Sequence, residues 1–299
     1  MPGTEIIEFF NNNVSTFFSP INVIAGSLFT AIFLRKNTAT QEFEKLKAGK
    51  FQEVADELLK SGKMTYTEYY KANNFLNVAK KADTFYSQME HENEKNCQHD
   101  LDWFMRFYEI VGNISDDKVQ DIWARIMAGE INNPHSYSLR TIDVLKNIGK
   151  QEAEVFSNIL SYCVVGDSHI FLPNYDEYLE KCGISYSQIM NLSEHGLIYN
   201  DASIVLKFSV SEEEEAYFVN QNYVITICSQ HEHVIEIKQF PLTTVGKELA
   251  TLVGNSMSDS VFITFAKTLN KEQMAKIQVH EIIKIEGDKI EYKKDNIIG

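Results

Sequence analysis

The stretch VSTFFSPINVIAGSLFTAIFL, residues 14–34, decides how this chain is organised. It holds 21 residues without a formal charge, although 23% of the residues in the whole chain are charged. Glu8 precedes it, and Arg35 and Lys36 close it. A helix that crosses a membrane needs about 20 mostly apolar residues. The stretch therefore has the length of a transmembrane helix.

Small and polar residues gather on one side of this predicted helix. At 100° per residue they fall within an arc of roughly 80°. Those residues are Ser15, Ser19, Asn22, Gly26 and Thr30. Bulky side chains such as Phe17, Ile24 and Leu28 occupy the other side. Membrane helices place small and hydroxylated residues against each other or along a water-filled path. Since one helix cannot enclose a pore, the pattern predicts a homo-oligomer with these five residues on its pore or oligomer face.

Two features of the stretch favour other interpretations. Ser19-Pro20 is typical of an N-cap followed by proline at the first helical position. A helix that starts there rises only about 22 Å by Leu34, which is less than a hydrocarbon core of about 30 Å. Asn22 is also costly in lipid unless it is paired. An interfacial anchor, or a helix buried in a core or an oligomer interface, therefore stays open beside the spanning helix.

The charge of the chain is uneven. The net charge is −14, and residues 35–100 carry as many basic as acidic side chains, so most of the excess lies in residues 101–299. An acidic body argues against broad nonspecific binding to nucleic acid, because that affinity comes mainly from Lys and Arg on phosphates. The four cysteines are scattered without a C-x-x-C pair, which favours reduced, cytosolic thiols.

The pattern predicts four segments. Residues 1–36 form the apolar membrane or oligomerisation helix, and residues 37–95 form a helical linker broken at Ser61-Gly62. Residues 96–165 form a helical domain, with helices expected at 101–111, 115–127, 139–147 and 152–162. Gly129 is expected to end the second of these helices.

Residues 166–299 are expected to form a winged-helix-like α+β domain. A short strand at 169–172 precedes helices at 175–181 and 186–195, and strands at 196–198 and 204–210 would form a hairpin. Further strands are expected at 223–228, 233–237, 261–265, 277–285 and 289–292, with a helix at 243–253. The predicted fold class is α+β and predominantly helical, with an N-terminal apolar helix, a helical middle domain and this C-terminal part.

Known catalytic and cofactor motifs are absent from the sequence, so no cofactor is expected and an enzyme is not the leading prediction. A nuclease or other hydrolase with a scattered site in the α/β part stays open as a third hypothesis. His231 and His233 would place two imidazoles on one face of a strand, but their spacing is not a standard zinc pattern. They are weak candidates for a metal site. The second helix of the winged-helix pattern, YSQIMNLSEH, has no Lys or Arg. A structural or protein-docking role suits it better than base recognition.

The segment DIWARIMAGEINNPHSYSLRT, residues 121–141, resembles the signature of a bacterial family known as domain of unknown function 2806. The resemblance continues through LTTVGKELATLV near Leu242, and it covers roughly residues 95–255. The signature positions are Trp123, Ala124, Arg125, Ile126, Met127, Ala128, Gly129, Glu130, Pro134, Ser136, Ser138, Arg140 and Thr141.

The signature has a structural and a functional interpretation. Trp123 can pack one helix face, and Arg140 could pair with Glu130 or cap carbonyls across the loop. Alternatively, Arg125 and Arg140, with Glu130, line a ligand site or a subunit contact. The family resemblance implies a protein similar to those of abortive infection against phage. The layout is more loosely similar to the Hailong membrane effector, which implies an oligomeric channel closed by a nucleic-acid ligand.

The sequence therefore predicts a membrane-associated, homo-oligomeric effector of anti-phage defence. It would act as a ligand-gated pore in the bacterial inner membrane with a cytoplasmic C-terminal domain. The expected partners are copies of itself, the lipid bilayer and a nucleotide or nucleic-acid regulator made by a partner enzyme. The alternative is a cytoplasmic oligomeric scaffold or regulator that binds a protein or nucleic-acid partner through its winged-helix-like part.

Overall fold

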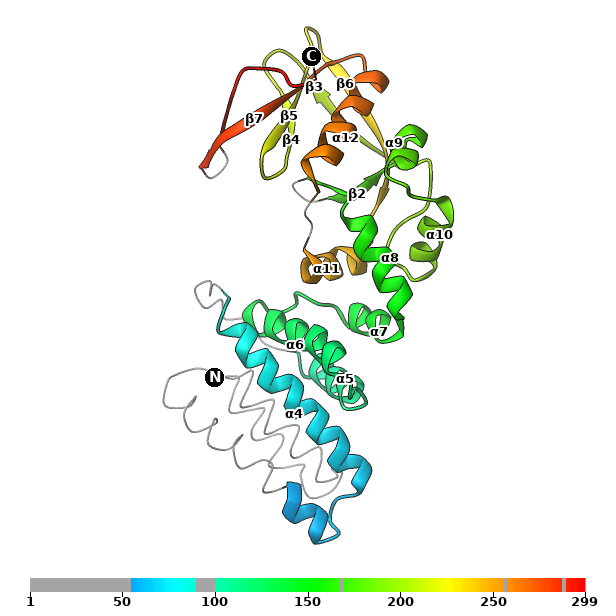
Figure 1. Cartoon of the computed structure of the whole chain (residues 1–299), viewed down its shortest axis with the longest axis vertical. Coiled ribbons are helices and arrows are strands. Elements are labelled where there is room, and N and C mark those ends of the chain that lie inside the picture. Colours follow the sequence, from blue (N-terminus) through cyan, green and yellow to red (C-terminus); the bar gives the residue numbers. More distant parts are fainter. Residues whose placement is uncertain (1–54, 90–99, 167–168, 255–256, 287–288, 299) are drawn as a thin grey trace. The chain divides into compact units, whose positions relative to one another are not determined.

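The computed structural model describes residues 55–89, 100–166, 169–254, 257–286 and 289–298 (Figure 1). About 49% of these residues are helical and 21% lie in strands, so the fold is mixed α and β. The predicted predominance of helix is not confirmed. The expected helix at 14–34, with its face of Ser15, Ser19, Asn22, Gly26 and Thr30, lies outside the described residues.

The chain divides into two compact units, Met1–Lys146 and Asn147–Gly299. The four segments expected from the sequence stay a prediction, because the boundaries near residues 36 and 95 fall outside the described residues.

In unit 1, helix α4 (Tyr66–Tyr86) begins with a capping box. Thr65 Oγ1 accepts the backbone N–H of Glu68 at 3.2 Å, and the Glu68 carboxylate accepts the N–H of Thr65 at 2.9 Å. A helical stretch ends at residue 60, and Gly62 takes a left-handed φ of 67°. The predicted break at Ser61-Gly62 is therefore confirmed.

Aromatic side chains hold α4 against helices α5 (Leu101–Val111) and α6 (Asp117–Asn132). Phe75 of α4 lies edge-on to Phe104 of α5, with ring centroids 5.7 Å apart. Phe107 of α5 stacks on Trp103 and meets Trp123 of α6 at 5.6 Å. These rings explain why residues 101–111 carry so many aromatics, since they form the core of unit 1.

The expected end of α6 at Gly129 is wrong, since the helix continues to Asn132. Asp116 caps its beginning by accepting two backbone N–H groups, each at 3.0 Å. Helix α7 (Leu139–Asn147) has the predicted bounds. Gly129 therefore lies in the interior of the helix, where it faces the ring of Tyr137.

Unit 2 begins with helices and short strands in alternation. In chain order they are α8 (Lys150–Leu160), β1 (Val164–Val165), β2 (Ile170–Pro173), α9 (Asp176–Lys181), α10 (Tyr186–Glu194) and β3 (Val205–Val210). Strand β6 (His233–Pro241) pairs antiparallel with both β2 and β3. The first sheet therefore has the order β1-β2-β6-β3.

The second sheet has the order β4-β5-β7-β8, and all of its pairs are antiparallel. Its strands are β4 (Ala216–Val219), β5 (Tyr223–Cys228), β7 (Lys276–Glu286) and β8 (Lys289–Tyr292). Helices α11 (Thr244–Val253) and α12 (Asp259–Glu272) lie between β6 and β7 in the sequence.

Phe265 of α12 joins the two sheets in one core. Its ring meets Phe171 of β2 at 6.3 Å, Phe218 of β4 at 5.6 Å and Tyr178 of α9 at 6.3 Å. The strand expected at 261–265 is therefore wrong. Phe262, Phe265, Ala266 and Leu269 are all buried, and their spacing is that of one helix face.

The hairpin expected between residues 196–198 and 204–210 is also wrong. Ile198 bridges to Leu242, and β3 pairs with β6 across an insertion that carries β4 and β5. Pairing over such a distance cannot be inferred from local turn signals.

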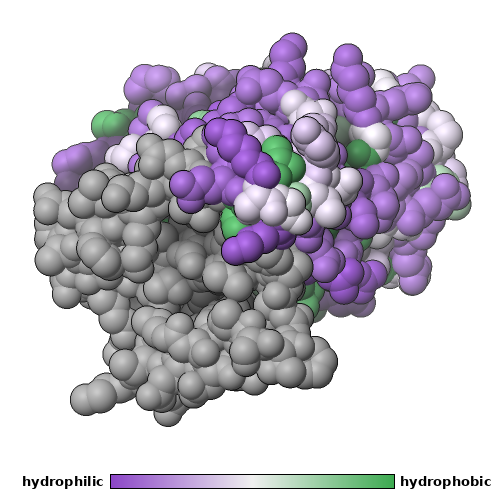
Figure 2. Space-filling model, turned by 90° about the horizontal axis from the view of Figure 1, so that it is seen from below, coloured by the Kyte–Doolittle hydropathy of each residue, from purple (hydrophilic) through white to green (hydrophobic). Residues whose placement is uncertain are grey.

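Within the described residues, no helix has both the length and the apolar character that a membrane crossing requires. Figure 2 shows their surface from one side as mainly hydrophilic, with hydrophobic residues in small separate spots.

Candidate functional site

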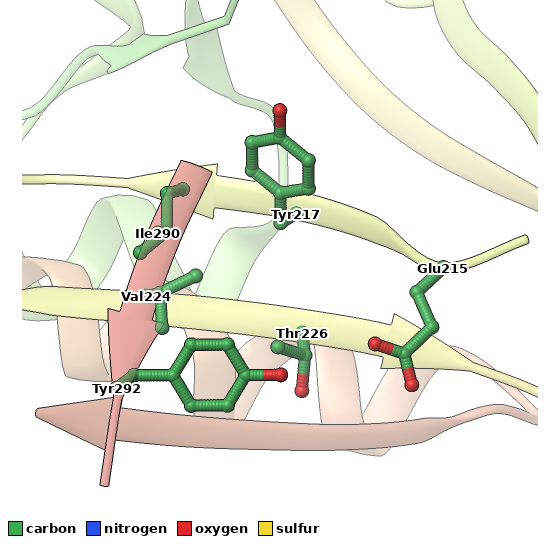
Figure 3. A pocket seen from close by; sticks show the side chains of 6 residues that line it. All are labelled: Glu215, Tyr217, Val224, Thr226, Ile290 and Tyr292. Carbon is green, nitrogen blue, oxygen red and sulfur yellow. The ribbon is translucent and has the colours of Figure 1, made fainter. Parts of the chain in front are cut away.

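A small open pocket lies on the second sheet and encloses about 140 Å³ (Figure 3). We call it the sheet pocket. Glu215 is the charged residue of its lining, two tyrosines contribute rings, and aliphatic side chains contribute methyl groups. The lining residues are Glu215, Tyr217, Val224, Thr226, Ile290 and Tyr292.

Strand pairing brings this lining together. Tyr217 of β4 lies opposite Thr226 of β5, so both side chains share one face of the sheet. Figure 3 shows β8 crossing that face at an angle, which brings Ile290 and Tyr292 over β5. On the other face, Ile225 and Ile227 are fully buried in the core. The core on the other face of the sheet therefore holds strand β5, which carries Val224 and Thr226 of the pocket.

A buried histidine fixes two of the lining residues. His280 of β7 stacks on Tyr292 with ring centroids 4.8 Å apart. Its Nδ1 lies 3.1 Å from the carbonyl oxygen of Asp295, and its Nε2 lies 3.4 Å from Thr226 Oγ1. A carbonyl only accepts, so Nδ1 donates and, in the neutral ring, Nε2 accepts from the Thr226 hydroxyl. The Thr226 oxygen is then left as an acceptor at the pocket.

Glu215 gives the pocket a negative potential. It is exposed, it ends the acidic run Glu212–Glu215, and no described residue pairs with its carboxylate. The pKa of Tyr292 is raised, first by burial and then by the charge of Glu215. The pKa of the nearby Cys228 thiol is also raised, first by burial and then by Glu215, against a smaller opposite effect of Lys276. A raised pKa disfavours a nucleophilic thiolate at neutral pH.

The sheet pocket thus combines a carboxylate, two tyrosine rings and an acceptor oxygen, a set that is suited to binding a ligand. Sequence reasoning missed it. The acidic run Glu212–Glu215 is typical of a solvated turn, and Thr226 and His280 are 54 residues apart, so only the β5–β7 pairing brings them together. The available signal was the polar Thr226 inside an apolar strand.

Among the predicted site residues, Glu130 has the most defined environment. It is 2% exposed at the end of α6, and its two carboxylate oxygens accept the backbone N–H groups of His135 at 2.7 Å and Tyr137 at 3.1 Å. Burial raises the pKa of Glu130, although these hydrogen bonds oppose the rise. Glu130 thereby orders the α6–α7 turn, in which His135 has a left-handed φ of 69°.

Gly129 and Thr141 complete this turn, which we call the signature corner (Gly129 to Thr141). A Cβ on Gly129 would lie 2.9 Å from Cε2 of Tyr137, so the tyrosine ring needs glycine there. The backbone N–H of Thr141 donates to Ser138 Oγ at 3.3 Å at the start of α7. These contacts agree with the structural interpretation of the signature.

The two signature arginines occupy different environments. The guanidinium of Arg125 lies over the ring of Phe85, 4.5 Å from its centroid, and so ties α6 to α4. Arg140 is exposed, and among the described residues it forms no ion pair with Glu130. The expected pairing of Arg140 with Glu130 is therefore wrong, because backbone N–H groups occupy the carboxylate. A ligand or subunit contact at Arg125 and Arg140 stays a prediction.

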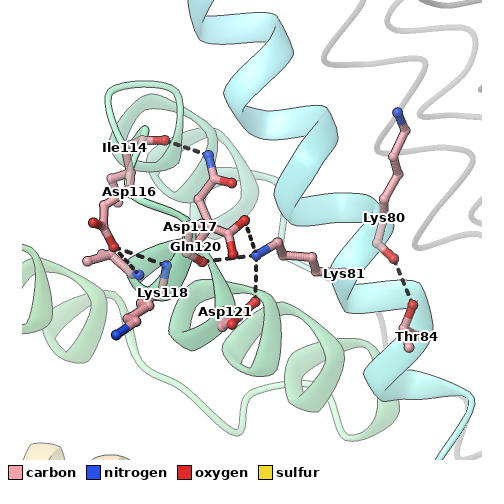
Figure 4. A network of polar contacts seen from close by, with 10 residues as sticks. Lys80, Lys81, Thr84, Ile114, Asp116, Asp117, Lys118, Gln120 and Asp121 are labelled. Carbon is pink, nitrogen blue, oxygen red and sulfur yellow. Dashed lines mark hydrogen bonds and ion pairs between the residues drawn. The ribbon is translucent and has the colours of Figure 1, made fainter.

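A second polar link joins the same two helices (Figure 4). Lys81 of α4 donates to the Asp117 carboxylate at 2.7 Å, to its backbone carbonyl at 2.9 Å and to Asp121 at 2.6 Å. These hydrogen bonds raise the pKa of Lys81. All three donors of the Lys81 ammonium group are used within unit 1, so the link ties α4 to α6.

The weak metal candidates are not on one strand. His231 precedes β6 and is exposed, whereas His233 is its first residue. The expectation that both lie on one strand face is therefore wrong. In the part of the chain that the structure describes, no group of three His, Cys, Asp or Glu side chains could hold a metal ion.

Comparison with known proteins gives one family. The family model described as "Protein of unknown function (DUF2806)" matches residues 60–266. That is well over half of the chain, so the chain belongs to this family. The match extends beyond both ends of residues 95–255, the range over which the sequence was expected to resemble this family. No curated protein and no solved structure matches the chain.

Proposed function

We propose that this member of the DUF2806 family is a ligand-responsive, homo-oligomeric effector of bacterial anti-phage defence, similar in layout to the Hailong effector. Unit 2 would sense a regulator, and residues 14–34 would insert in the inner membrane and open a path that depolarises the cell. The observation that carries the proposal is the uncharged 21-residue stretch with one small polar face. The C-terminal domain would be cytoplasmic.

The sensing role of unit 2 is supported by its chemistry. Its sheet pocket combines fixed rings with a carboxylate that lacks a partner among the described residues. A regulator can only shift the effector between closed and open states if it binds them with different affinity. The predicted nucleotide or nucleic-acid regulator stays a prediction, and its phosphates would have to avoid Glu212–Glu215.

Expression in bacteria tests the proposal. Cells that produce the full chain should lose membrane potential, as read by a potential-sensitive dye, and should stop growing. Deletion of residues 1–36 should abolish both effects. The single change Ile24→Arg should do the same, because a charge at the centre of a membrane helix is costly.

Ser61→Arg serves as the matched control, because it adds the same charge at an exposed position just before α4. It should leave depolarisation intact. Undiminished toxicity in the truncated chain would contradict the pore.

A second candidate is an oligomeric scaffold or regulator that docks a partner through a winged-helix-like module. The order α8, β2, α9, α10, β3, β6 and the sheet order β2-β6-β3 support this candidate. Helix α10 exposes Tyr186 and carries no basic residue, which suits a protein partner better than DNA.

Two measurements separate this candidate from the first. A scaffold should form oligomers in buffer without detergent, as measured by analytical ultracentrifugation, and should leave the membrane potential unchanged. Its α10 should not bind duplex DNA through the salt-dependent contacts to phosphates that DNA-binding proteins make. Tight DNA binding that Tyr186→Ser abolishes would contradict the protein-docking role.

A further inference from the structure

We propose that the sheet pocket binds a guanidinium or ammonium group at the end of an alkyl chain, with Glu215 as its counter-ion. This proposal deepens the proposed function, since it names the chemical class that unit 2 senses. The binding itself stands on the geometry of the pocket alone.

The charge of the pocket selects a cation. Glu215 is the charged residue of the lining, and three further glutamates, Glu212 to Glu214, precede it in the chain. After burial, the charge of Glu215 is the next cause of the raised pKa values of Tyr292 and Cys228. Because like charges repel at this range, a phosphate is disfavoured here.

The hydrogen-bonding groups of the pocket also suit a donor. The Glu215 carboxylate only accepts, and Thr226, which is 5% exposed, uses its hydroxyl proton on His280 and so presents an acceptor oxygen. Figure 3 shows the Glu215 carboxylate and the Tyr292 hydroxyl at the same end of the pocket as Thr226. A guanidinium or ammonium group has donors and no acceptor, which complements this end.

The aromatic lining adds attraction for a cation. Tyr217 and Tyr292 contribute their rings, and Tyr292 is held in place by its stacking on His280. A cation over a tyrosine face is attracted by the ring quadrupole. Val224 and Ile290 offer methyl groups to the alkyl chain.

The size of the pocket limits what enters. Its volume of about 140 Å³ is far below that of pockets that hold a whole cofactor, which enclose roughly 300–1,000 Å³. One terminal group with a short alkyl stem fits such a volume. That group could belong to a free amine or to an arginine or lysine side chain of a protein.

Methyl NMR on the full chain tests the proposal. Butylguanidinium should shift the methyl signals of Val224, Thr226 and Ile290 in a saturable manner, whereas its neutral isostere butylurea should bind about tenfold more weakly. A short peptide with one arginine, compared with the same peptide carrying citrulline, forms the second arm. Tighter binding of the arginine peptide than of butylguanidinium identifies a protein side chain, and the reverse identifies a free amine.

Substitutions locate the site. Glu215→Gln should weaken butylguanidinium binding about tenfold, and Tyr292→Leu should weaken it further. Glu213→Gln is the matched control, because Glu213 lies in the same acidic run but not in the lining, and it should change the affinity less than twofold. Equal binding of butylurea, or equal losses in the two glutamate variants, would overturn the proposal.

Adenosine monophosphate serves as the anionic test ligand in the same titration. If it shifts the same methyl signals and butylguanidinium does not, the pocket is not a cation site. These titrations use purified protein and are independent of the membrane. A pocket that binds the cation in a chain that never depolarises cells would refute only the proposed function.

Discussion

The signature corner and the sheet pocket each contain a glutamate, and the two carboxylates differ in almost every respect. Glu130 is 2% exposed and accepts two backbone N–H groups, whereas Glu215 is exposed and has no partner among the described residues. A carboxylate whose acceptors are filled by its own chain has little capacity left for a ligand. The signature corner therefore orders the fold with its own carboxylate, while the candidate binding group lies elsewhere.

The largest expected effect is the loss of the Glu130 carboxylate. Glu130→Ala should lower the free energy of unfolding of unit 1 by about 2–4 kcal/mol, because it leaves the part-buried N–H of His135 and the buried N–H of Tyr137 without acceptors. Glu130→Gln keeps one oxygen and should cost about 1 kcal/mol. Urea unfolding followed by tryptophan fluorescence measures this directly, since both tryptophans, Trp103 and Trp123, are buried in unit 1.

Glu109→Ala is the control for this experiment, because Glu109 is an exposed carboxylate on α5. It should change the stability by less than about 0.5 kcal/mol. If Glu130→Ala behaves like Glu109→Ala, the signature corner does not depend on its carboxylate and a ligand role for Glu130 becomes the better account.

The next effect concerns the fit of Gly129 to Tyr137. Gly129→Ala should destabilise unit 1 by about 1–2 kcal/mol, because the clash with the tyrosine ring outweighs the better helix propensity of alanine. In a Tyr137→Leu background the same change should cost nothing or stabilise. A double-mutant cycle with a coupling energy near zero would show that the ring does not set the requirement for glycine.

A smaller effect is the pH dependence that Glu130 confers. Its pKa in the folded protein is raised above the usual 4.5, so between these two pKa values the folded state holds a proton that the unfolded chain has lost. Stability falls with rising pH wherever the folded state binds more protons. The Glu130 contribution should therefore be full below about pH 4.5 and should be lost as the pH rises through the raised pKa. Relative to Glu130→Gln, the urea midpoint of the native chain should decline over this range; parallel curves would contradict the assignment.

The smallest effect should come from Glu215. Glu215→Gln should change the unfolding free energy of unit 2 by less than about 0.5 kcal/mol, because the carboxylate has no partner to lose. Circular dichroism of the variant during thermal unfolding provides the measurement. A clear destabilisation would mean that Glu215 supports the fold, and the contrast with Glu130 would disappear.

Elements with strong local signals were predictable. The helix predicted at 101–111 has the observed bounds of α5 (Leu101–Val111). The strands predicted at 277–285 and 289–292 correspond to β7 and β8. Helix α12 was mistaken for a strand at 261–265, because its β-branched and aromatic residues suit both structures and only tertiary packing decides. The sheet pocket was beyond local reasoning, because its residues come from three strands separated by a helical insertion.

Fractionation of bacteria that express the full chain tests the proposed effector most directly. The account predicts that the chain sediments with membranes, resists extraction by high salt and is released only by detergent. It also predicts that Ile24→Arg moves the chain out of the membrane fraction while Ser61→Arg does not. A native chain that stays in the supernatant without detergent would contradict the membrane role of residues 14–34.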